Sequence, residues 1–240
     1  MKIITDFLLE QDIPFLENVE LSKLTWLRRG GMANILVMPC DSKQLELICK
    51  FLYGNGIKFD LFGHTSNLYI HNSYNSSIIV STKKCKSFKE YDNYIWCEAG
   101  AHVSTIARYF VDNGYSGMEY LTNLPGTIGG AIYNNSSCKK SVVSDLLIEA
   151  GVLLNNGSFE IWSNNDFHFS FRKSIFKSGI KEGIILFVKK KKKKSNRLLL
   201  KQISIDNEKD RRVNILNPSK TLGSTFSSQY DNGKMSLKYR

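Results

Sequence analysis

The sequence predicts an α+β fold made of short strands and two amphipathic helices. Apolar runs of strand length recur between residues 35 and 188, and two of the segments between them carry apolar residues at helical spacing. A loop rich in glycine and proline, residues 124–131, suits neither a helix interior nor a central strand. With 240 residues, 42% of them hydrophobic, the chain is long enough to bury a substantial core.

The first predicted unit is a strand, a helix and a strand. An apolar run at 35–38 is followed by Asp41, a suitable helix N-cap, with Gln44 in the capping-box position. Apolar residues at helical spacing then continue to Leu52, the helix is expected to end at Gly54 or Gly56, and 59–62 returns as a strand. Because ligands bind beyond the carboxyl ends of strands in such βαβ-like units, the next turn is an expected ligand site.

That turn has small residues that allow backbone N–H groups to approach a phosphate closely. A simple turn without a ligand is the alternative interpretation, since short turns of this kind are common. The candidate binding residues in it are Gly63, His64, Thr65, Ser66 and Asn67.

The second half of the sequence predicts one more helix and several strands. The helix begins near His102 and ends at Gly114. Strands are expected at 78–80, 94–97, 146–154, 158–162 and 184–188, with a hairpin turn at 155–157. In the loop at 124–131, three glycines and a proline fall within six residues, which predicts exposed backbone held against a flat or charged ligand.

The net charge of +11 depends on one block, since six of the positive charges come from residues 189–194. A run of like charges is typical of a solvated connector, and a nucleic-acid-binding segment is the alternative. No aromatic residues interleave the run as a stacking surface would require, so we expect a connector and no nucleic-acid partner.

Cysteine and histidine usage predicts neither a disulfide framework nor a metal site. The five cysteines form no C-x-x-C pair, and the four histidines have no metal-ligand spacing. No stretch approaches the ~18 apolar residues of a membrane span, and the N-terminus lacks the order of a signal peptide. We therefore expect a cytoplasmic protein without a metal and without a membrane segment.

Seven short motifs follow one another along the chain: Arg29-Gly30-Gly31-Met32-Ala33, Gly63 to Asn67, Ala99-Gly100-Ala101, Gly114 to Glu119, Pro125 to Ala131 followed by Asn134, Phe171 to Phe176, and Gly223 to Phe226. In this order, over residues 22–226, they resemble the UDP-N-acetylenolpyruvoylglucosamine reductase family of peptidoglycan synthesis, the MurB family. The resemblance implies a two-subdomain FAD-binding fold of the PCMH type with an incomplete third, substrate-binding domain.

The resemblance also implies domain boundaries and a flavin site. Residues 1–80 and 81–188 would form the two FAD-binding subdomains, and 189–240 a basic connector with the truncated start of the substrate-binding domain. Besides the turn at 63–67, the residues implied to hold FAD are Gly100, Ala101, Pro125, Gly126, Thr127, Ile128, Gly129, Gly130, Ala131 and Asn134.

The implied reaction is the NADPH-driven reduction of UDP-N-acetylglucosamine enolpyruvate to UDP-N-acetylmuramate through FAD. Hydride addition builds negative charge beside the substrate carboxylate, which requires a nearby cation and a proton donor. By their match to the family motifs, Arg172 would be the cation and Ser224 the proton donor.

The sequence departs from the family pattern at four places. Thr65 replaces a glycine, Phe171 replaces a tyrosine, and residues 135–139 replace a stretch of small residues. The glutamate that ends the family's catalytic set has no counterpart before Arg240, so we expect a C-terminally truncated member. A member that binds FAD without reducing the substrate, and a flavin oxidase acting on another small molecule, are the alternatives.

Overall fold

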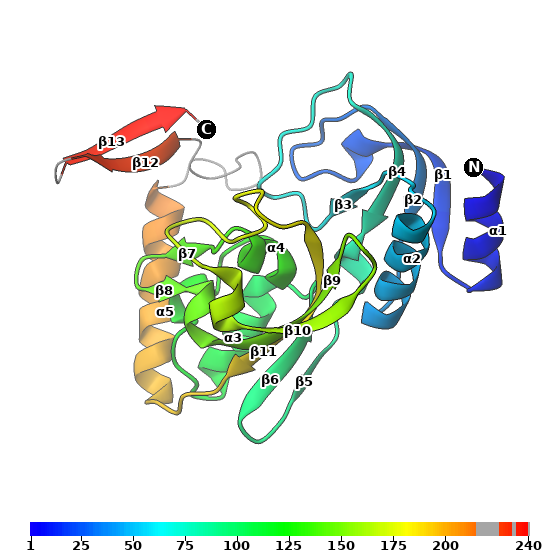
Figure 1. Cartoon of the computed structure of the whole chain (residues 1–240). Helices are drawn as coiled ribbons and strands as arrows, with labels where there is room; N and C mark the ends of the chain where they lie inside the picture. Colours follow the sequence, from blue (N-terminus) through cyan, green and yellow to red (C-terminus); the bar gives the residue numbers. More distant parts are fainter. Residues whose placement is uncertain (215–225, 232–233, 240) are drawn as a thin grey trace.

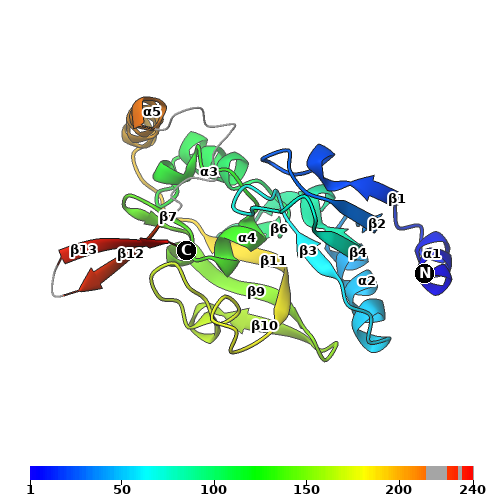
Figure 2. The same cartoon turned by 90° about the horizontal axis from the view of Figure 1, so that it is seen from above.

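The computed structural model describes residues 1–214, 226–231 and 234–239, and shows two units built around β-sheets that lie side by side (Figure 1). The N-terminal unit comprises α1 to β4, and the central unit comprises β5 to β11. Seen from above, α5 lies on the side of the central unit that faces away from the N-terminal unit (Figure 2).

The N-terminal unit is a four-stranded sheet of order β1-β2-β4-β3 with two helices. Its elements are α1 (Lys2–Glu10), β1 (Phe15–Glu20), β2 (Met32–Val37), α2 (Ser42–Gly54), β3 (Asp60–Phe62) and β4 (Asn75–Ser81). Strands β2 and β3 both run parallel to β4, which lies between them, so the expected βαβ-like unit is confirmed. The predicted N-cap is also present, because Asp41 accepts a hydrogen bond from the backbone N–H of Gln44 at 2.8 Å.

The central unit is a five-stranded antiparallel sheet of order β10-β9-β11-β6-β5. Its main elements are β5 (Phe88–Glu90), β6 (Tyr94–Glu98), α3 (Val103–Asp112), α4 (Ile128–Tyr133), β7 (Ser137–Cys138), β8 (Ser141–Val142), β9 (Leu147–Leu154), β10 (Phe159–Ser163) and β11 (Gly183–Lys191). Helices α3 and α4 bury Ile106, Phe110 and Ile132 against the sheet. The β9–β10 hairpin and the helix after His102 agree with the sequence predictions.

The two units share an apolar core. Side chains of α2, β2 and β4 form one buried cluster with Leu153 of β9 and with Ile184 and Leu186 of β11. Burying apolar side chains stabilises by roughly 1.5–3 kcal/mol each, so this shared cluster fixes the units relative to one another.

Helices α1 and α5 (Arg197–Asn214) were not expected from the sequence. Helix α5 is mostly polar and is held largely by hydrogen bonds: the buried Asn207 donates to the carbonyl of Tyr120 at 3.1 Å, and Ser204 contacts Thr122 at 2.8 Å. Because polar side chains make these contacts, the sequence of α5 shows no apolar stripe that would have predicted the helix. The chain continues to β12 (Phe226–Asp231) and β13 (Lys234–Tyr239).

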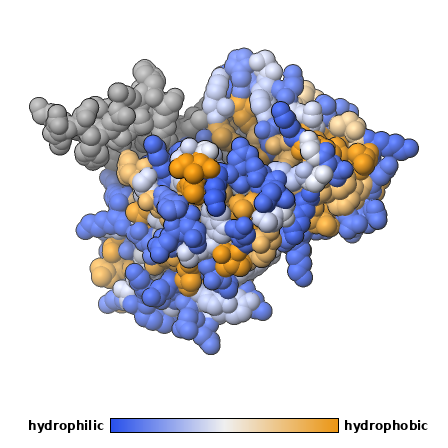
Figure 3. All heavy atoms as spheres, viewed as in Figure 1, coloured by the Kyte–Doolittle hydropathy of each residue, from blue (hydrophilic) through white to orange (hydrophobic). Residues whose placement is uncertain are grey.

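The molecular surface is mostly polar, with apolar side chains gathered toward the right-hand end of Figure 3, over the N-terminal unit. The exposed apolar side chains of that unit include Ile3, Leu9 and Leu16. Ile3 and Leu9 belong to α1 and Leu16 belongs to β1, the two elements at the outer edge of this unit (Figure 1).

The lysine block is not a solvated connector, so that interpretation is wrong. Strand β11 extends to Lys191 and pairs with both β6 and β9, so the predicted boundary after residue 188 falls within a central strand. Lys189 pairs with Glu149 at 2.6 Å, and the fully buried Lys190 donates to the carbonyl of Val143 at 2.6 Å. Burial lowers the pKa of Lys190 to about 8. Strand pairing and these acceptors outweigh the repulsion between neighbouring lysines.

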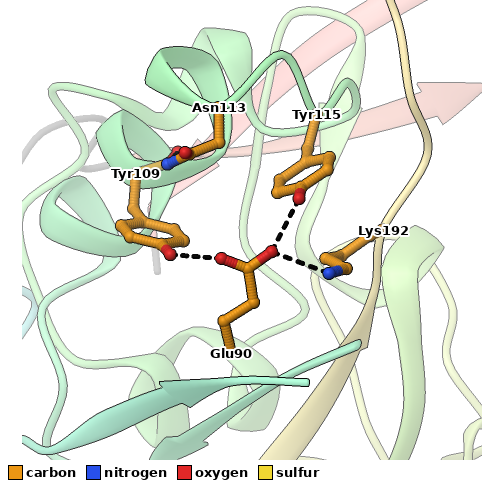
Figure 4. A network of polar contacts seen from close by, with 5 residues as sticks. All are labelled: Glu90, Tyr109, Asn113, Tyr115 and Lys192. Atoms are coloured by element: carbon orange, nitrogen blue, oxygen red, sulfur yellow. Dashed lines mark hydrogen bonds and ion pairs between the residues drawn. The ribbon is translucent and has the colours of Figure 1, made fainter. Parts of the chain in front are cut away.

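Beyond the strand, the block is held by a polar network centred on Glu90 (Figure 4). Glu90 accepts hydrogen bonds from the hydroxyl groups of Tyr109 and Tyr115 and from Lys192 at 2.7 Å. The hydrogen bond from Lys192, followed by those from the two tyrosines, lowers the pKa of Glu90 to about 2. This network joins β5, α3 and the lysine block.

We predict that Glu90→Gln lowers the free energy of unfolding by about 1–2 kcal/mol at pH 7, because hydrogen bonds to a charged acceptor are lost. Since the folded-state pKa is depressed, this contribution is present above the unfolded-state pKa of about 4.3 and is lost as pH falls toward about 2. Urea unfolding of both proteins at several pH values measures the difference, which should shrink below about pH 4.3.

Glu46→Gln is the matched control, because Glu46 forms only an i,i+4 ion pair with Lys50 at 2.6 Å on α2. Such pairs contribute about 0.2–0.5 kcal/mol. A cost for Glu90→Gln no larger than that of the control would contradict the prediction.

Candidate functional site

A cavity of about 2090 Å³ is lined by residues of both units. It is larger than the roughly 300–1,000 Å³ of most small-molecule pockets, so its size suits an extended ligand. Its walls include two turns, residues 63–67 after β3 and residues 124–127 before α4, together with a third loop that carries Arg172.

The two turns approach each other closely. A Cβ atom placed on Gly63 would lie 2.6 Å from Oγ1 of Thr127, and one on Gly126, whose φ is +120°, would lie 3.1 Å from Oγ of Ser66. Only glycine fits both the left-handed backbone of Gly126 and this separation. The shared apolar core therefore places the two glycine-containing turns face to face.

Both turns present backbone donors to the cavity. Leu68 donates to the carbonyl of Thr65 at 3.1 Å, which closes the first turn and leaves its central amides unused. Within the described part of the chain, the N–H groups of Ser66, Asn67, Gly126 and Thr127 donate no hydrogen bond. Unpaired amides of two facing turns form a binding site for an anion.

Thr65, which replaces the glycine of the family pattern, has a φ of +55°. A left-handed conformation costs a residue with a side chain roughly 1–2 kcal/mol. The buried Thr65 hydroxyl accepts from the N–H of Trp26 at 2.9 Å and donates to the carbonyl of His64 at 2.7 Å. Hydrogen bonds of about 1 kcal/mol each offset the strain, so the turn keeps its shape without glycine.

The sequence-based expectation of an exposed loop over all of residues 124–131 is wrong, because α4 begins at Ile128. Thr127 caps this helix by accepting from the N–H of Gly130 at 3.3 Å. Gly129 lies against Ala99: its N–H donates to the Ala99 carbonyl at 2.8 Å, and an added Cβ would lie 2.9 Å from the Ala99 Cβ. This close packing, rather than helix propensity, explains the glycine within a helix.

Three of the predicted flavin-binding residues lie in the core instead of lining the cavity. Ile128 and Ala101 are buried and joined by a backbone hydrogen bond of 2.8 Å. Gly100 is also buried, and a Cβ there would lie 1.7 Å from the carbonyl oxygen of Thr82. These residues position the turns. The other predicted residues of this set line the cavity: Gly63, His64, Thr65, Ser66, Asn67, Pro125, Gly126, Thr127, Gly129, Gly130, Ala131 and Asn134.

Arg172 reaches the same cavity from a tight hairpin. Ser170 and Lys173 exchange two backbone hydrogen bonds of 3.1 Å, which places Phe171 and Arg172 at the tip. Arg172 has a φ of +58° and lines the cavity, while Phe171 is 63% exposed beside the guanidinium. The predicted cation thus lines the same cavity as the two turns, whereas Ser224 lies outside the described residues.

Sequence analysis missed two residues that hold this hairpin in place. Asn135 donates from Nδ2 to the carbonyl of Ser170 at 2.9 Å, and Ser174 donates to the carbonyl of Tyr133 at 2.6 Å. Both bonds tie the Arg172 hairpin to the end of α4. An asparagine just after a helix is a known signal for a left-handed residue, and Asn135 has a φ of +44°.

One polar side-chain atom near the cavity is buried without a partner. Nδ2 of Asn123, a residue that lines the cavity, has no acceptor among the described residues. Leaving such a group unpaired costs roughly 1–3 kcal/mol.

His64 and His102 form an imidazole pair behind the turns, with ring centroids 4.1 Å apart in an edge-to-face arrangement. Burial, then His102 and Lys83, lower the pKa of His64 to about 4. Burial, then Lys86 and Lys83, lower the pKa of His102. Both imidazoles are therefore neutral at pH 7 in the free protein.

Comparison with known proteins identifies a family. The profile of the FAD binding domain family matches residues 33–161. The UDP-N-acetylenolpyruvoylglucosamine reductase of Lactobacillus helveticus is 30% identical over 166 residues, which are 69% of this chain and 56% of that protein. The enzyme of the same name from Caldicellulosiruptor saccharolyticus is 32% identical over 166 residues, 69% of this chain and 54% of that protein. The chain therefore spans little more than half the length of these relatives.

Solved structures share the fold. The UDP-N-acetylenolpyruvylglucosamine reductase (MurB) of Thermus caldophilus superposes with a TM-score of 0.71 at 22% identity, covering 90% of this chain and 76% of that one. A glucooligosaccharide oxidase of Acremonium strictum gives a TM-score of 0.58 at 15% identity, covering 80% and 42%. The expected two-subdomain FAD-binding architecture is confirmed by this match and by the family profile.

Two kinds of feature are absent from the described residues. None of their helices combines the length and apolar character needed to cross a membrane. Nor do three or more of their histidine, cysteine, aspartate or glutamate side chains come together in a group suited to a metal ion.

We predict that Gly129→Ala destabilises the protein by about 1–3 kcal/mol, because the added methyl group would overpack the contact with Ala99. Urea unfolding checks this. Gly54→Ala is the control, since this other helical glycine has no heavy atom within 4 Å of its Cβ position, and alanine there should stabilise by up to about 1 kcal/mol. A Gly129→Ala protein as stable as the parent would show that the packing at Ala99 is loose.

Proposed function

Because the chain belongs to the FAD binding domain family, we propose that its cavity binds FAD, with the diphosphate against the adjacent turns at 63–67 and 124–127. The observation that carries this proposal is the set of backbone amides in these two cavity-lining turns that have no hydrogen-bond acceptor among the described residues. A diphosphate bridging them would accept hydrogen bonds from both units at once.

The residues present fit such a group. Four amides without partners among the described residues offer donors without any lysine in the turns. Glycine at 126 allows the two turns to approach, because a Cβ atom there would lie 3.1 Å from Oγ of Ser66. The size of the cavity, about 2090 Å³, suits a dinucleotide better than a mononucleotide.

For the reaction, we propose the reduction of UDP-N-acetylenolpyruvoylglucosamine that the names of the curated relatives give. We further propose that NADPH drives it and that it serves peptidoglycan precursor synthesis. This function implies a cytoplasmic enzyme. Bound FAD would supply the hydride. Arg172 would grip the substrate carboxylate with two parallel hydrogen bonds and stabilise the negative charge that develops beside it. Ser224, proposed from the family motif, would donate the proton.

We predict that the purified protein binds FAD and that Gly126→Val weakens binding by about tenfold or more, which corresponds to about 1.4 kcal/mol. Valine at φ +120° would strain the turn and place side-chain atoms near Ser66. Quenching of flavin fluorescence on titration measures the affinity.

Gly157→Val is the control for this variant. Gly157 also has a positive φ of +84°, but it lies in the β9–β10 hairpin turn, with no heavy atom within 4 Å of its Cβ position and outside the cavity lining. Equal loss of affinity in both variants would attribute the effect to general strain, and a parent protein that binds no FAD would refute the proposed function.

We further predict that Arg172→Ala lowers the rate of substrate-dependent NADPH oxidation by about 10²–10³-fold, as expected for removal of one group that stabilises transition-state charge. Arg172→Lys should restore little of the rate, because an ammonium cannot form the bidentate contact. FAD affinity serves as the internal control, since Arg172 lies on a separate hairpin from the two turns.

The second candidate function is FAD binding without reduction of this substrate, which the match of the FAD binding domain profile to residues 33–161 supports. The same assay distinguishes the two. A protein that binds FAD but oxidises no NADPH in the presence of the enolpyruvyl nucleotide has the second function.

A further inference from the structure

The imidazole pair lies where the two turns meet. His64 belongs to the first turn and lines the cavity. His102 immediately precedes α3 and forms an isolated antiparallel bridge with Thr127 of the second turn. The flanking backbone bonds run from Val103 to Gly126 at 3.1 Å and from Ile128 to Ala101 at 2.8 Å. Contact between the two rings therefore links the turns that the proposed function assigns to the diphosphate.

The surroundings of the pair are cationic. The charged side chains that act on the two rings are Lys83, at the end of the short helix η2 (Thr82–Lys84), and Lys86 just beyond it. Lys83 donates to the carbonyl of Leu24 at 2.7 Å rather than to a carboxylate. Among the described residues, no carboxylate contributes to the electrostatics of either ring. Among the described residues, this region therefore combines positive charge and unpaired amides with no carboxylate acting on the rings. Such a region is suited to bind an anion.

We propose that His64, supported by His102, donates a charged hydrogen bond to the diphosphate of bound FAD and takes up a proton as FAD binds. This inference rests on the proposed function and adds a residue and a regulation to that site. A single side chain of the 63–67 turn would then act beside the backbone amides as a specific contact to the anion.

The physical reason is linkage. An adjacent anion favours the protonated imidazole and raises its pKa by about 1–3 units, from about 4 in the free protein. Between the free and bound pKa values, binding takes up a proton, so affinity rises as pH falls. Burial, then His102 and Lys83, oppose protonation of His64 in the free protein, and an anion beside the ring offsets their effect.

The test is isothermal titration of the whole chain with FAD at pH 5.5, 6.5 and 7.5, in two buffers of different ionisation enthalpy. We expect a proton uptake at pH 5.5 that approaches one per FAD, and an affinity that falls by up to tenfold per pH unit. Riboflavin, which has no diphosphate, should bind without this uptake.

Two variants test whether His64 is the group that takes up the proton. His64→Asn should abolish the uptake and weaken FAD binding at pH 5.5 by about tenfold, while binding at pH 7.5 changes little. His71→Asn is the matched control, because this exposed histidine, which contacts Ser73 at 2.7 Å, lies outside the cavity lining and should leave the pH dependence unchanged.

The outcomes separate the inference from the proposed function. FAD binding without proton uptake, or an undiminished pH dependence in His64→Asn, would overturn the role of His64 and leave FAD binding intact. A parent chain that binds no FAD at any of the three pH values would overturn both.

Discussion

The apolar core shared by the two units is the constraint on which the site depends. Leu153, Ile184 and Leu186 of the central sheet are buried together with side chains of α2, β2 and β4. The position of one cavity-lining turn relative to the other is not determined by the sequence of either turn, because the two turns belong to different units. Their separation, with Gly126 and Ser66 close enough that a Cβ would lie 3.1 Å from a hydroxyl, is set by that buried cluster.

A second set of packing contacts positions the turn that precedes α4. Gly129 lies against Ala99, and the bonds from Gly129 to Ala99 and from Ile128 to Ala101 hold the start of α4 beside the segment that precedes α3. The same segment ends at His102, whose ring contacts His64. The buried residues Ala101 and Ile128 therefore matter to the site through position, even though they do not line the cavity.

The sequence predicted elements that local signals determine. The helix after Asp41 has its cap, its apolar face and its terminal glycine within one short segment, and the structure contains each of them. The helix after His102 and the β9–β10 hairpin are of the same kind. For the site, the family motifs brought together both turns and Arg172, and these residues do line one cavity.

What the sequence did not predict depends on contacts between distant residues. Helix α4 contains Gly129, which the approach of Ala99 explains. The lysine block forms the end of a central strand, because Glu149, the carbonyl of Val143 and Glu90 supply acceptors from three separate segments. Helix α5 is fixed by Asn207 and Ser204, which are polar residues on a polar helix. None of these partners is local, so no short pattern could indicate them.

Several residues with a left-handed backbone lie at or beside the candidate site, although Asp12, Asn18, Arg28 and His168 adopt this conformation elsewhere. Thr65 and Arg172 both line the cavity in left-handed conformations, with φ values of +55° and +58°, and Asn135, at +44°, holds the Arg172 hairpin. Each such residue costs of order 1–3 kcal/mol and persists only where its surroundings determine it. Here the hydroxyl of Thr65, the amide of Asn135 and the mutual bonds of Ser170 and Lys173 are those surroundings. Because the fold already meets these costs without a ligand, the ligand's own contacts need not supply the energy to form the site, and more of its interaction energy remains for affinity.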